Sequence, residues 1–148
     1  MTNSSARQPA DQSVRDECLD VSQSFVVTAP AGSGKTSLLT QRALGLLATV
    51  SDPESILCIT FTRKAAAEMR QRVISALTKA NNEAQPDDPN GAKTWRLARA
   101  VLEQDRSHQW QLLENPNRLR ITTIDGLCRS IANQLPMTAG LGLGMDNL

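Results

Sequence analysis

The sequence predicts an α/β domain with a mostly parallel sheet and helices on both of its faces. Short apolar runs alternate with stretches whose apolar residues recur at helical spacing, as in chains of strand and helix units. The run at 56–61 is apolar on both faces, as a parallel strand covered from two sides must be. A loop of small residues separates the first apolar run from the first helical stretch, and ligands of such sheets bind where strands end.

The first half of the chain is interpreted from its apolar spacing. Residues 25–27 are apolar and run into Thr28-Ala29-Pro30, which predicts a buried strand that ends at a loop. Apolar residues then recur at three- and four-residue spacing from 35 to 50, which predicts a helix, and a turn follows at 51–53. The periodic residues of this helix are Leu39, Ala43, Leu46, Leu47 and Val50.

The second half repeats the pattern around a helical insert at 81–118. A strand at 56–61 leads to a helix over 65–77, and the polar stretch at 81–92 reads as a loop. Trp95, Ala98, Val101 and Leu102 predict a further helix. A strand at 119–124 and a helix at 126–135 complete the series, with Leu127, Ile131 and Leu135 on one helix face.

Length and composition indicate one ordinary cytoplasmic domain. The 148 residues suffice for one core, so residues 14–148 form the domain and the polar residues 1–13 are predicted to be disordered. A net charge of +1 means that any contact with nucleic acid must come from a local patch. Neither a membrane-spanning run nor the apolar core of a secretory signal is present in the sequence. The scattered cysteines Cys18, Cys58 and Cys128 are expected to be reduced thiols.

The loop after the first predicted strand has the residues of a phosphate-binding loop. Small residues let backbone N–H groups approach phosphates, Lys35 can reach the β- and γ-phosphates, and the Thr36 hydroxyl can ligate Mg²⁺. The first position of the pattern G-x-x-x-x-G-K-[ST] is alanine here, and a glycine-rich turn with a capping lysine is the structural alternative. We expect ATP with Mg²⁺ to bind Ala29, Pro30, Ala31, Gly32, Ser33, Gly34, Lys35 and Thr36.

Three segments together carry a family resemblance. APAGSGKT (29–36) and ITFTRKAAAEMRQRV (59–73) resemble motifs I and Ia of the UvrD/Rep-type superfamily 1 DNA helicases, in which an alanine at position 29 is usual. TTIDGLCRSIA (122–132) is similar to the segment of those proteins that reads T-[FI]-[HD]-x-[FL]-C, and Asp125 leans toward the RecB/AddA-like, exodeoxyribonuclease V beta-like branch. The resemblance covers 12–142 and implies a P-loop NTPase (RecA-like) fold, present here as a partial domain.

The second segment suits contact with a DNA strand. Helix-start N–H groups, the Thr62 hydroxyl and two cations, Arg63 and Lys64, suit a phosphodiester backbone, and Phe61 can stack on an unpaired base. The family resemblance implies this role for these four residues. The alternative is that Phe61 is a core residue and that the cations form a solvated helix face.

The third segment is given the same DNA role, through Thr123 and Asp125. Asp125 also has a rival interpretation, because a strand that ends in a carboxylate has the form of a Walker B metal-binding acid. Thr122 and Thr123 interrupt the apolar run, however, and no glutamate follows to orient the attacking water.

Four further residues have weaker assignments. Gln12 lies near the distance expected for the family's adenine-recognising glutamine, whereas Val14 occupies the nearer spacing. His108 is the only histidine and has no ligand or nucleophile spaced near it, so it is taken as a filler. The spacing of Trp95 and Trp110 fits helix packing in the insert.

The resemblance implies an ATP-dependent DNA helicase, or the helicase–nuclease subunit of a double-strand-break repair enzyme. It would bind single-stranded DNA or DNA ends and would work with a second helicase or nuclease subunit. The metal-holding carboxylate, the water-orienting glutamate and the arginines of a second lobe are not identifiable, so the chain is expected to be an N-terminal fragment that is inactive alone. The alternatives are another P-loop enzyme such as a small kinase, or a non-catalytic nucleotide-binding or interaction module.

Overall fold

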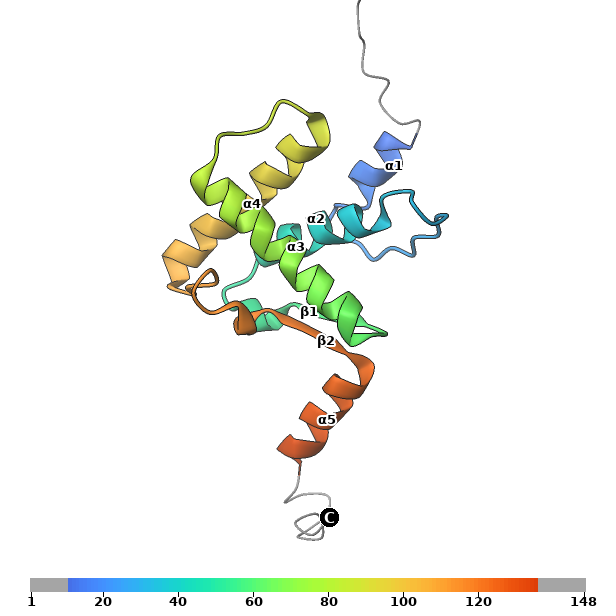
Figure 1. The fold of residues 1–148 in the computed structure, drawn as a ribbon, viewed down its shortest axis with the longest axis vertical. Coiled ribbons are helices and arrows are strands. Elements are labelled where there is room, and N and C mark those ends of the chain that lie inside the picture. The colour runs from blue at the N-terminus through green and yellow to red at the C-terminus, as the bar shows by residue number, and fades with distance from the viewer. Residues whose placement is uncertain (1–10, 136–148) are drawn as a thin grey trace, which may run out of the picture.

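The structure, a computed structural model, describes residues 11–135 as five α-helices and a two-stranded sheet (Figure 1). The remaining parts of the predicted disordered N-terminus and of the predicted domain, 1–10 and 136–148, lie outside the described residues. No helix within 11–135 has the length and apolar character to cross a membrane. The elements are α1 (Gln12–Glu17), α2 (Lys35–Leu47), η1 (Pro53–Ser55), β1 (Leu57–Thr60), α3 (Arg63–Asn82), α4 (Pro89–His108), η2 (Pro116–Arg118), β2 (Arg120–Thr123) and α5 (Ile124–Gln134).

The sheet consists of β1 and β2, which pair in parallel from Leu57↔Arg120 to Thr60↔Thr123. Both were predicted as strands from their apolar runs, and their parallel orientation is confirmed. Helices α3 and α4 lie between them in the chain, as the crossover of a parallel pair requires. A larger sheet with helices on both faces remains a prediction.

The predicted buried strand at 25–27 is wrong. These residues form no strand, and Val26 is 97% exposed. A strand needs a neighbour for its backbone hydrogen bonds, and no strand within 11–135 pairs with this segment. It is held instead by Arg42 of α2, whose guanidinium lies 5.2 Å from the centroid of the Phe25 ring and donates to the Gln23 carbonyl oxygen at 2.6 Å.

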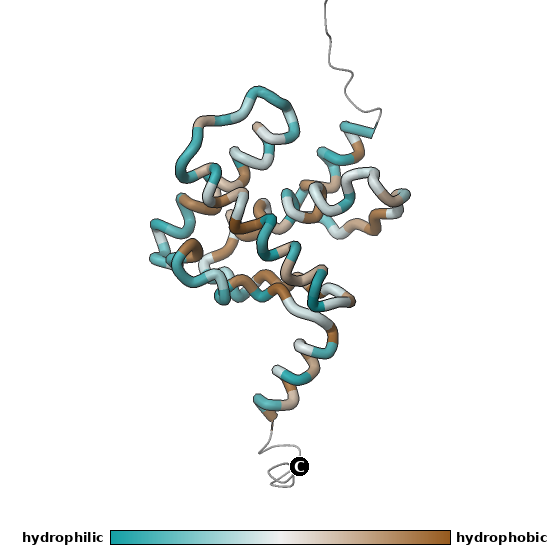
Figure 2. Tube along the Cα trace, viewed as in Figure 1, coloured by the Kyte–Doolittle hydropathy of each residue, from teal (hydrophilic) through white to brown (hydrophobic). Residues whose placement is uncertain are grey.

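The predicted burial of β1 on both faces is also wrong. Strand β1 is largely apolar, and hydrophobic residues gather in the region of the sheet (Figure 2), but Leu57 is 39% exposed and Ile59 is 49% exposed. Cys58, whose side chain points to the other face, is half-buried and packs against the core. The apolar run therefore identified a strand with two apolar faces, of which one is covered within the described residues.

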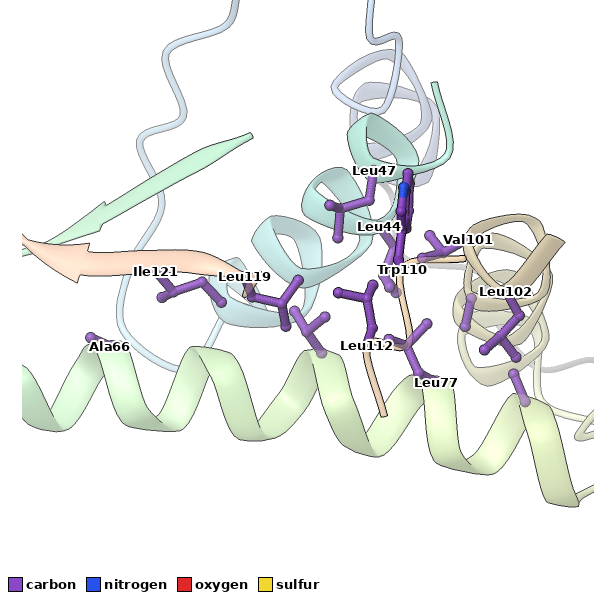
Figure 3. Close-up of a cluster of buried hydrophobic side chains, with 13 residues drawn as sticks. Leu44, Leu47, Ala66, Leu77, Val101, Leu102, Trp110, Leu112, Leu119 and Ile121 are labelled. Carbon is purple, nitrogen blue, oxygen red and sulfur yellow. The ribbon is translucent and has the colours of Figure 1, made fainter. Parts of the chain in front are cut away.

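The core lies where α2, α3 and α4 meet the sheet (Figure 3). Trp110 is 2% exposed, and its indole N–H donates to the Ser51 carbonyl oxygen at 2.7 Å, so its polar atom is satisfied. This confirms a packing role for Trp110, while Trp95 is half-buried on α4. The labelled core residues are Leu44, Leu47, Ala66, Leu77, Val101, Leu102, Trp110, Leu112, Leu119 and Ile121.

The insert contains more helix than the composition of residues 81–92 predicted. Helix α3 extends to Asn82, and α4 begins at Pro89. The Asp88 carboxylate accepts a hydrogen bond from the Gly91 N–H at 2.6 Å, and proline is well suited to the first helical position. Turn-forming residues at 86–91 thus serve as a helix start. The buried Gln41 amide of α2 donates to Asn90 Oδ1 at 2.9 Å and ties this start to α2.

Helix α5 extends away from the rest of the molecule (Figure 1). It begins two residues before the predicted start at 126, because Thr123 caps it. None of its residues is buried, and Ile124 and Ile131 are 53% and 47% exposed. Its apolar stripe, predicted from periodicity, includes the half-buried Leu127 and the exposed Ile131, and no α5 residue in it is fully buried within 11–135.

Candidate nucleotide and nucleic-acid site

The phosphate loop turns at two glycines in the left-handed region. Gly32 has φ +80° and Gly34 has φ +85°, a conformation that side chains with a Cβ disfavour. Gly34 is the residue before α2, a 13-residue helix whose first N–H groups have no partner within the helix. The loop therefore ends at a helix N-terminus, which is the geometry that binds phosphate.

Lys35 and Thr36 form the first turn of α2, and both are exposed. The Lys35 ammonium donates to the Ala29 carbonyl oxygen at 2.5 Å, so it lies across the loop that it follows in sequence. This cation and the helix N-terminus are placed together, as the phosphate-loop prediction requires. The predicted residues 29–36 thus form one continuous loop and helix start.

Helix α1 contributes a residue to the loop that sequence reasoning missed. The Arg15 guanidinium donates to the Ser33 carbonyl oxygen, and a Cβ on Gly34 would lie 3.0 Å from Arg15 Nη1. Arg15 is held from the other side by Asp11 at 2.8 Å. Arg15 and Lys35 line one cavity of about 170 Å³. No contiguous motif contains Arg15, so the sequence carried no signal for it.

Gln12 lies on the same helix. Its side-chain amide donates to Asp16 Oδ1 at 3.0 Å, one helical turn away. The described structure thus places Gln12 on the helix that touches the phosphate loop and gives it an intrahelical partner. Its role in adenine recognition remains a prediction.

The second part of the site lies where the two parallel strands end. Thr60 and Thr123 are paired in register at the carboxyl ends of β1 and β2, so both strands end at the same edge of the sheet. The Thr62 hydroxyl accepts from the Ala65 N–H at 3.1 Å and caps α3. The Thr123 hydroxyl accepts from the Gly126 N–H at 3.1 Å and caps α5. Two helix N-termini therefore open side by side at this edge.

Phe61 separates β1 from α3 and is 89% exposed. Phe61 is therefore not a core residue within 11–135. An exposed aromatic ring next to two helix starts is available for stacking on a planar ligand.

A cavity of about 480 Å³ lies at this edge and is lined by residues of both segments. Thr62 and Lys64 are exposed in the same capped turn as Arg63 and are not among the lining residues. The two predicted segments, far apart in sequence, thus meet at one concave surface. The predicted strand-contacting residues that line it are Phe61, Arg63, Thr123 and Asp125.

Two further arginines line the cavity and were not predicted as contacts. Arg70 Nη2 donates to the Ile121 carbonyl oxygen at 2.9 Å, and its buried Nε has no hydrogen-bond partner within 11–135. Arg129 is exposed on α5. Helical spacing was the available signal, since Arg70 follows Arg63 by two turns and Arg129 follows Asp125 by one.

Asp125 and Thr36 of the phosphate loop line different cavities. A Walker B role would require its carboxylate beside Thr36. Thr36 lines a groove between α2 and β1, whereas Asp125 lines the cavity with Phe61. The geometry therefore groups Asp125 with the predicted strand-contacting residues.

A groove between α2 and β1 has a volume of about 370 Å³. Thr36, beside the phosphate loop, and Thr60, at the end of β1, both line it. Cys58 also lines it, and burial raises the pKa of this thiol above its ordinary value. All three cysteines are free thiols.

Comparison with known proteins finds a matching family and several similar helicases. The UvrD/REP helicase N-terminal domain family matches residues 10–144. The chain is 34% identical over 110 residues to an ATP-dependent helicase/nuclease subunit of Heliobacterium modesticaldum, covering 74% of this chain and 6% of that protein. The helicase/nuclease subunit of the same name from Desulforamulus reducens is 38% identical over 107 residues, which are 70% of this chain and 7% of that protein.

A shorter match is closer in sequence. DNA helicase II of Haemophilus influenzae is 54% identical over 55 residues, 36% of this chain and 8% of that protein. The chain thus spans 6–8% of the length of these three relatives. No solved structure matches the chain.

Proposed function

Because the chain belongs to the family of UvrD/REP helicase N-terminal domains, we propose that it is the nucleotide-binding and strand-contacting part of an ATP-dependent DNA helicase. The single observation that carries this proposal is the edge of the parallel pair. Two threonine-capped helix starts, an exposed phenylalanine and three arginines meet there at one cavity.

At the phosphate loop, backbone N–H groups of residues 32–35 would hold the β-phosphate, and Lys35 would neutralise charge on the β- and γ-phosphates. The Thr36 hydroxyl would ligate Mg²⁺. The left-handed glycines and the following helix N-terminus fit this role. Bound Mg-ATP would supply the phosphoanhydride bond whose hydrolysis drives strand movement. We assign no catalytic residue for that hydrolysis to this chain.

At the strand-contacting edge, Arg63 and Lys64 would pair with phosphodiester groups, and the N–H groups that open α3 and α5 would add partial positive charge. Phe61 would stack on an unpaired base without identifying it. Thr123 and Asp125 lie on the other wall of the cavity, and Arg70 and Arg129 add cations to the predicted set.

Coupling between the two ends would pass through the groove between α2 and β1. Thr40 on α2 lies 3.8 Å from the Met69 sulfur on α3, so the helix that follows the phosphate loop touches the helix that follows Phe61. A shift of α2 on nucleotide binding would therefore press directly on α3. This contact supports a motor in which nucleotide state changes the grip on DNA.

For the intact protein we propose a helicase–nuclease subunit of cytoplasmic double-strand-break repair. Relatives named as ATP-dependent helicase/nuclease subunits support this assignment over other P-loop enzymes. Its substrates would be single-stranded DNA and DNA ends, and the naming of those relatives as subunits supports a further protein chain as its partner. A non-catalytic module is the less favoured function, because the phosphate loop keeps its glycines and lysine.

The test of the strand-contacting role is the salt dependence of single-strand binding. The double variant Arg63→Ala/Lys64→Ala should weaken binding of a labelled single strand, measured by fluorescence anisotropy across a potassium chloride series. Losing two phosphate contacts should reduce the slope of log K against log salt by about 1.4.

The matched control is Arg96→Ala/Arg106→Ala, which removes two exposed cations from α4. It lowers the net charge by the same amount, so its slope should stay at the unmodified value. Equal slopes for the two double variants would mean that Arg63 and Lys64 do not contact phosphates and belong to a solvated helix face.

A further inference from the structure

We propose, on the premise that the single-stranded DNA function holds, that Asp125 makes the cavity prefer bases with an exocyclic amino group. The predicted stacking on Phe61 does not distinguish bases, because every base has a π-face. A carboxylate in the same cavity distinguishes them by their edges.

The cavity is otherwise suited to an anion. Arg63, Arg70 and Arg129 line it, and Asp125 is the one acidic residue among the described residues that line it. A carboxylate repels the phosphodiester groups that the arginines attract. Its position is therefore explained better by a hydrogen-bond donor of the ligand than by the DNA backbone.

Asp125 has its acceptor capacity available. Within residues 11–135 its carboxylate makes no hydrogen bond or ion pair, although Arg129 follows it by one helical turn. The cap of α5 is supplied by the Thr123 hydroxyl, not by Asp125. Asp125 lies in the first turn of α5, where the helix dipole stabilises a carboxylate. That stabilisation does not explain why this turn lines a cavity.

Phe61 would hold a base with its edge free. The ring is 89% exposed and lines the same cavity as Asp125. Cytosine, adenine and guanine present amino groups that donate to a carboxylate, as in the pairing of aspartate with cytosine N4. Thymine and uracil have no exocyclic amino group, and their one edge donor, N3–H, lies between two carbonyl oxygens that repel a carboxylate.

The test compares two homopolymers whose bases differ at C4, an amino group in cytosine and a carbonyl oxygen in uracil, and in the proton that uracil therefore carries on N3. Deoxycytidine and deoxyuridine oligonucleotides of equal length are titrated with the 148-residue chain at mildly alkaline pH, where cytosine is unprotonated. One charge-assisted hydrogen bond at a partly exposed site should make deoxycytidine bind about fivefold tighter. In Asp125→Asn, whose amide both donates and accepts, the ratio should fall to about one.

The matched control is Glu103→Gln, which removes an exposed carboxylate from α4 and should leave the fivefold ratio in place. Should Asp125→Asn misfold by circular dichroism, Asp125→Ser replaces it, since serine also favours helix starts. If the unmodified chain binds the two homopolymers equally and Phe61→Ala weakens the binding of both, the base preference is overturned and the strand-contacting role remains. Failure of the unmodified chain to bind either homopolymer would overturn both.

Discussion

At the scale of single residues, the proposed phosphate-binding role of the Lys35 ammonium gives the most direct experimental test. It lies 2.5 Å from the Ala29 carbonyl oxygen, at the mouth of the phosphate loop. Lys35→Ala should weaken Mg-ATP binding about tenfold or more, because a charged hydrogen-bond donor to phosphate is lost. Calorimetric titration of the chain measures this directly.

The control for that titration is Lys79→Ala, which removes an exposed lysine near the far end of α3. Its affinity for Mg-ATP should match that of the unmodified chain. Equal affinities for all three proteins would mean that the loop is a glycine-rich turn whose lysine serves only as a cap.

Residues within contiguous motifs could be predicted, and residues that join the site through folding could not. Phe61 and Arg63 lie in one short segment, so the sequence alone shows an aromatic ring and a cation next to each other at the start of a predicted helix. Arg15 reaches the phosphate loop from a separate helix, and the site on Phe61 is shared with Arg129 from a segment far along the chain. Helical spacing places Arg129 one turn after Asp125, but the meeting of segments far apart in the chain depends on tertiary packing, which local spacing does not encode.

At the scale of elements, strands were the hardest to place. The predictions of β1 and β2 from their apolar runs are confirmed because the two strands pair with each other in the structure. The run at 25–27 has comparable apolar character, yet a strand exists only when a neighbour accepts and donates its hydrogen bonds. Asp88 and Pro89 show the converse problem, since residues typical of turns form a capped helix start.

The start of α4 provides an element-scale prediction. The Asp88 carboxylate accepts from the Gly91 N–H at 2.6 Å, and alanine cannot replace that acceptor. Asp88→Ala should lower the free energy of unfolding by about 1 kcal/mol, measured by urea denaturation. Asp87→Ala, which alters the exposed neighbour, should change it by less than about 0.5 kcal/mol. Similar losses in both variants would contradict the capping role.

The two short 3₁₀ helices that precede the strands are joined by an ion pair. Arg118 of η2 donates to both carboxylate oxygens of Glu54 of η1, at 2.6 and 3.0 Å. This hydrogen bonding holds the pKa of Glu54 below its ordinary value. A carboxyl whose folded pKa is depressed contributes stability above its unfolded pKa and loses it as pH falls through the folded pKa.

We therefore expect the urea midpoint to fall as the solution is acidified through about pH 4, the ordinary range of a glutamate. Glu54→Gln should flatten this part of the pH dependence and cost at most about 1 kcal/mol at neutral pH, since the pair is partly exposed. Glu114→Gln, at an exposed position after α4, should retain the dependence of the unmodified chain. A Glu54→Gln profile that superimposes on that of the unmodified chain would exclude the ion pair as its source.

At the scale of the whole molecule, the described residues combine a closed core with open apolar surfaces. The core between α2, α3 and α4 buries Trp110, whereas Val26, Ile59 and Ile131 of α5 are exposed within 11–135. Composition predicted the core, because it counts apolar residues. It could not predict which apolar faces stay uncovered, since that depends on how many strands and helices are packed together.

The parallel pairing of β1 with β2 also has a consequence for kinetics. Two parallel strands cannot be joined by a tight turn. In this chain the helices α3 and α4 lie between β1 and β2. Helices form from local contacts, while closure of a long intervening chain is entropically slow. After dilution from urea, far-ultraviolet circular dichroism should therefore recover before the ability to capture a single strand, followed by stopped-flow anisotropy. A single rate shared by both signals would contradict this order, in which the proposed strand-contacting edge of the sheet forms last.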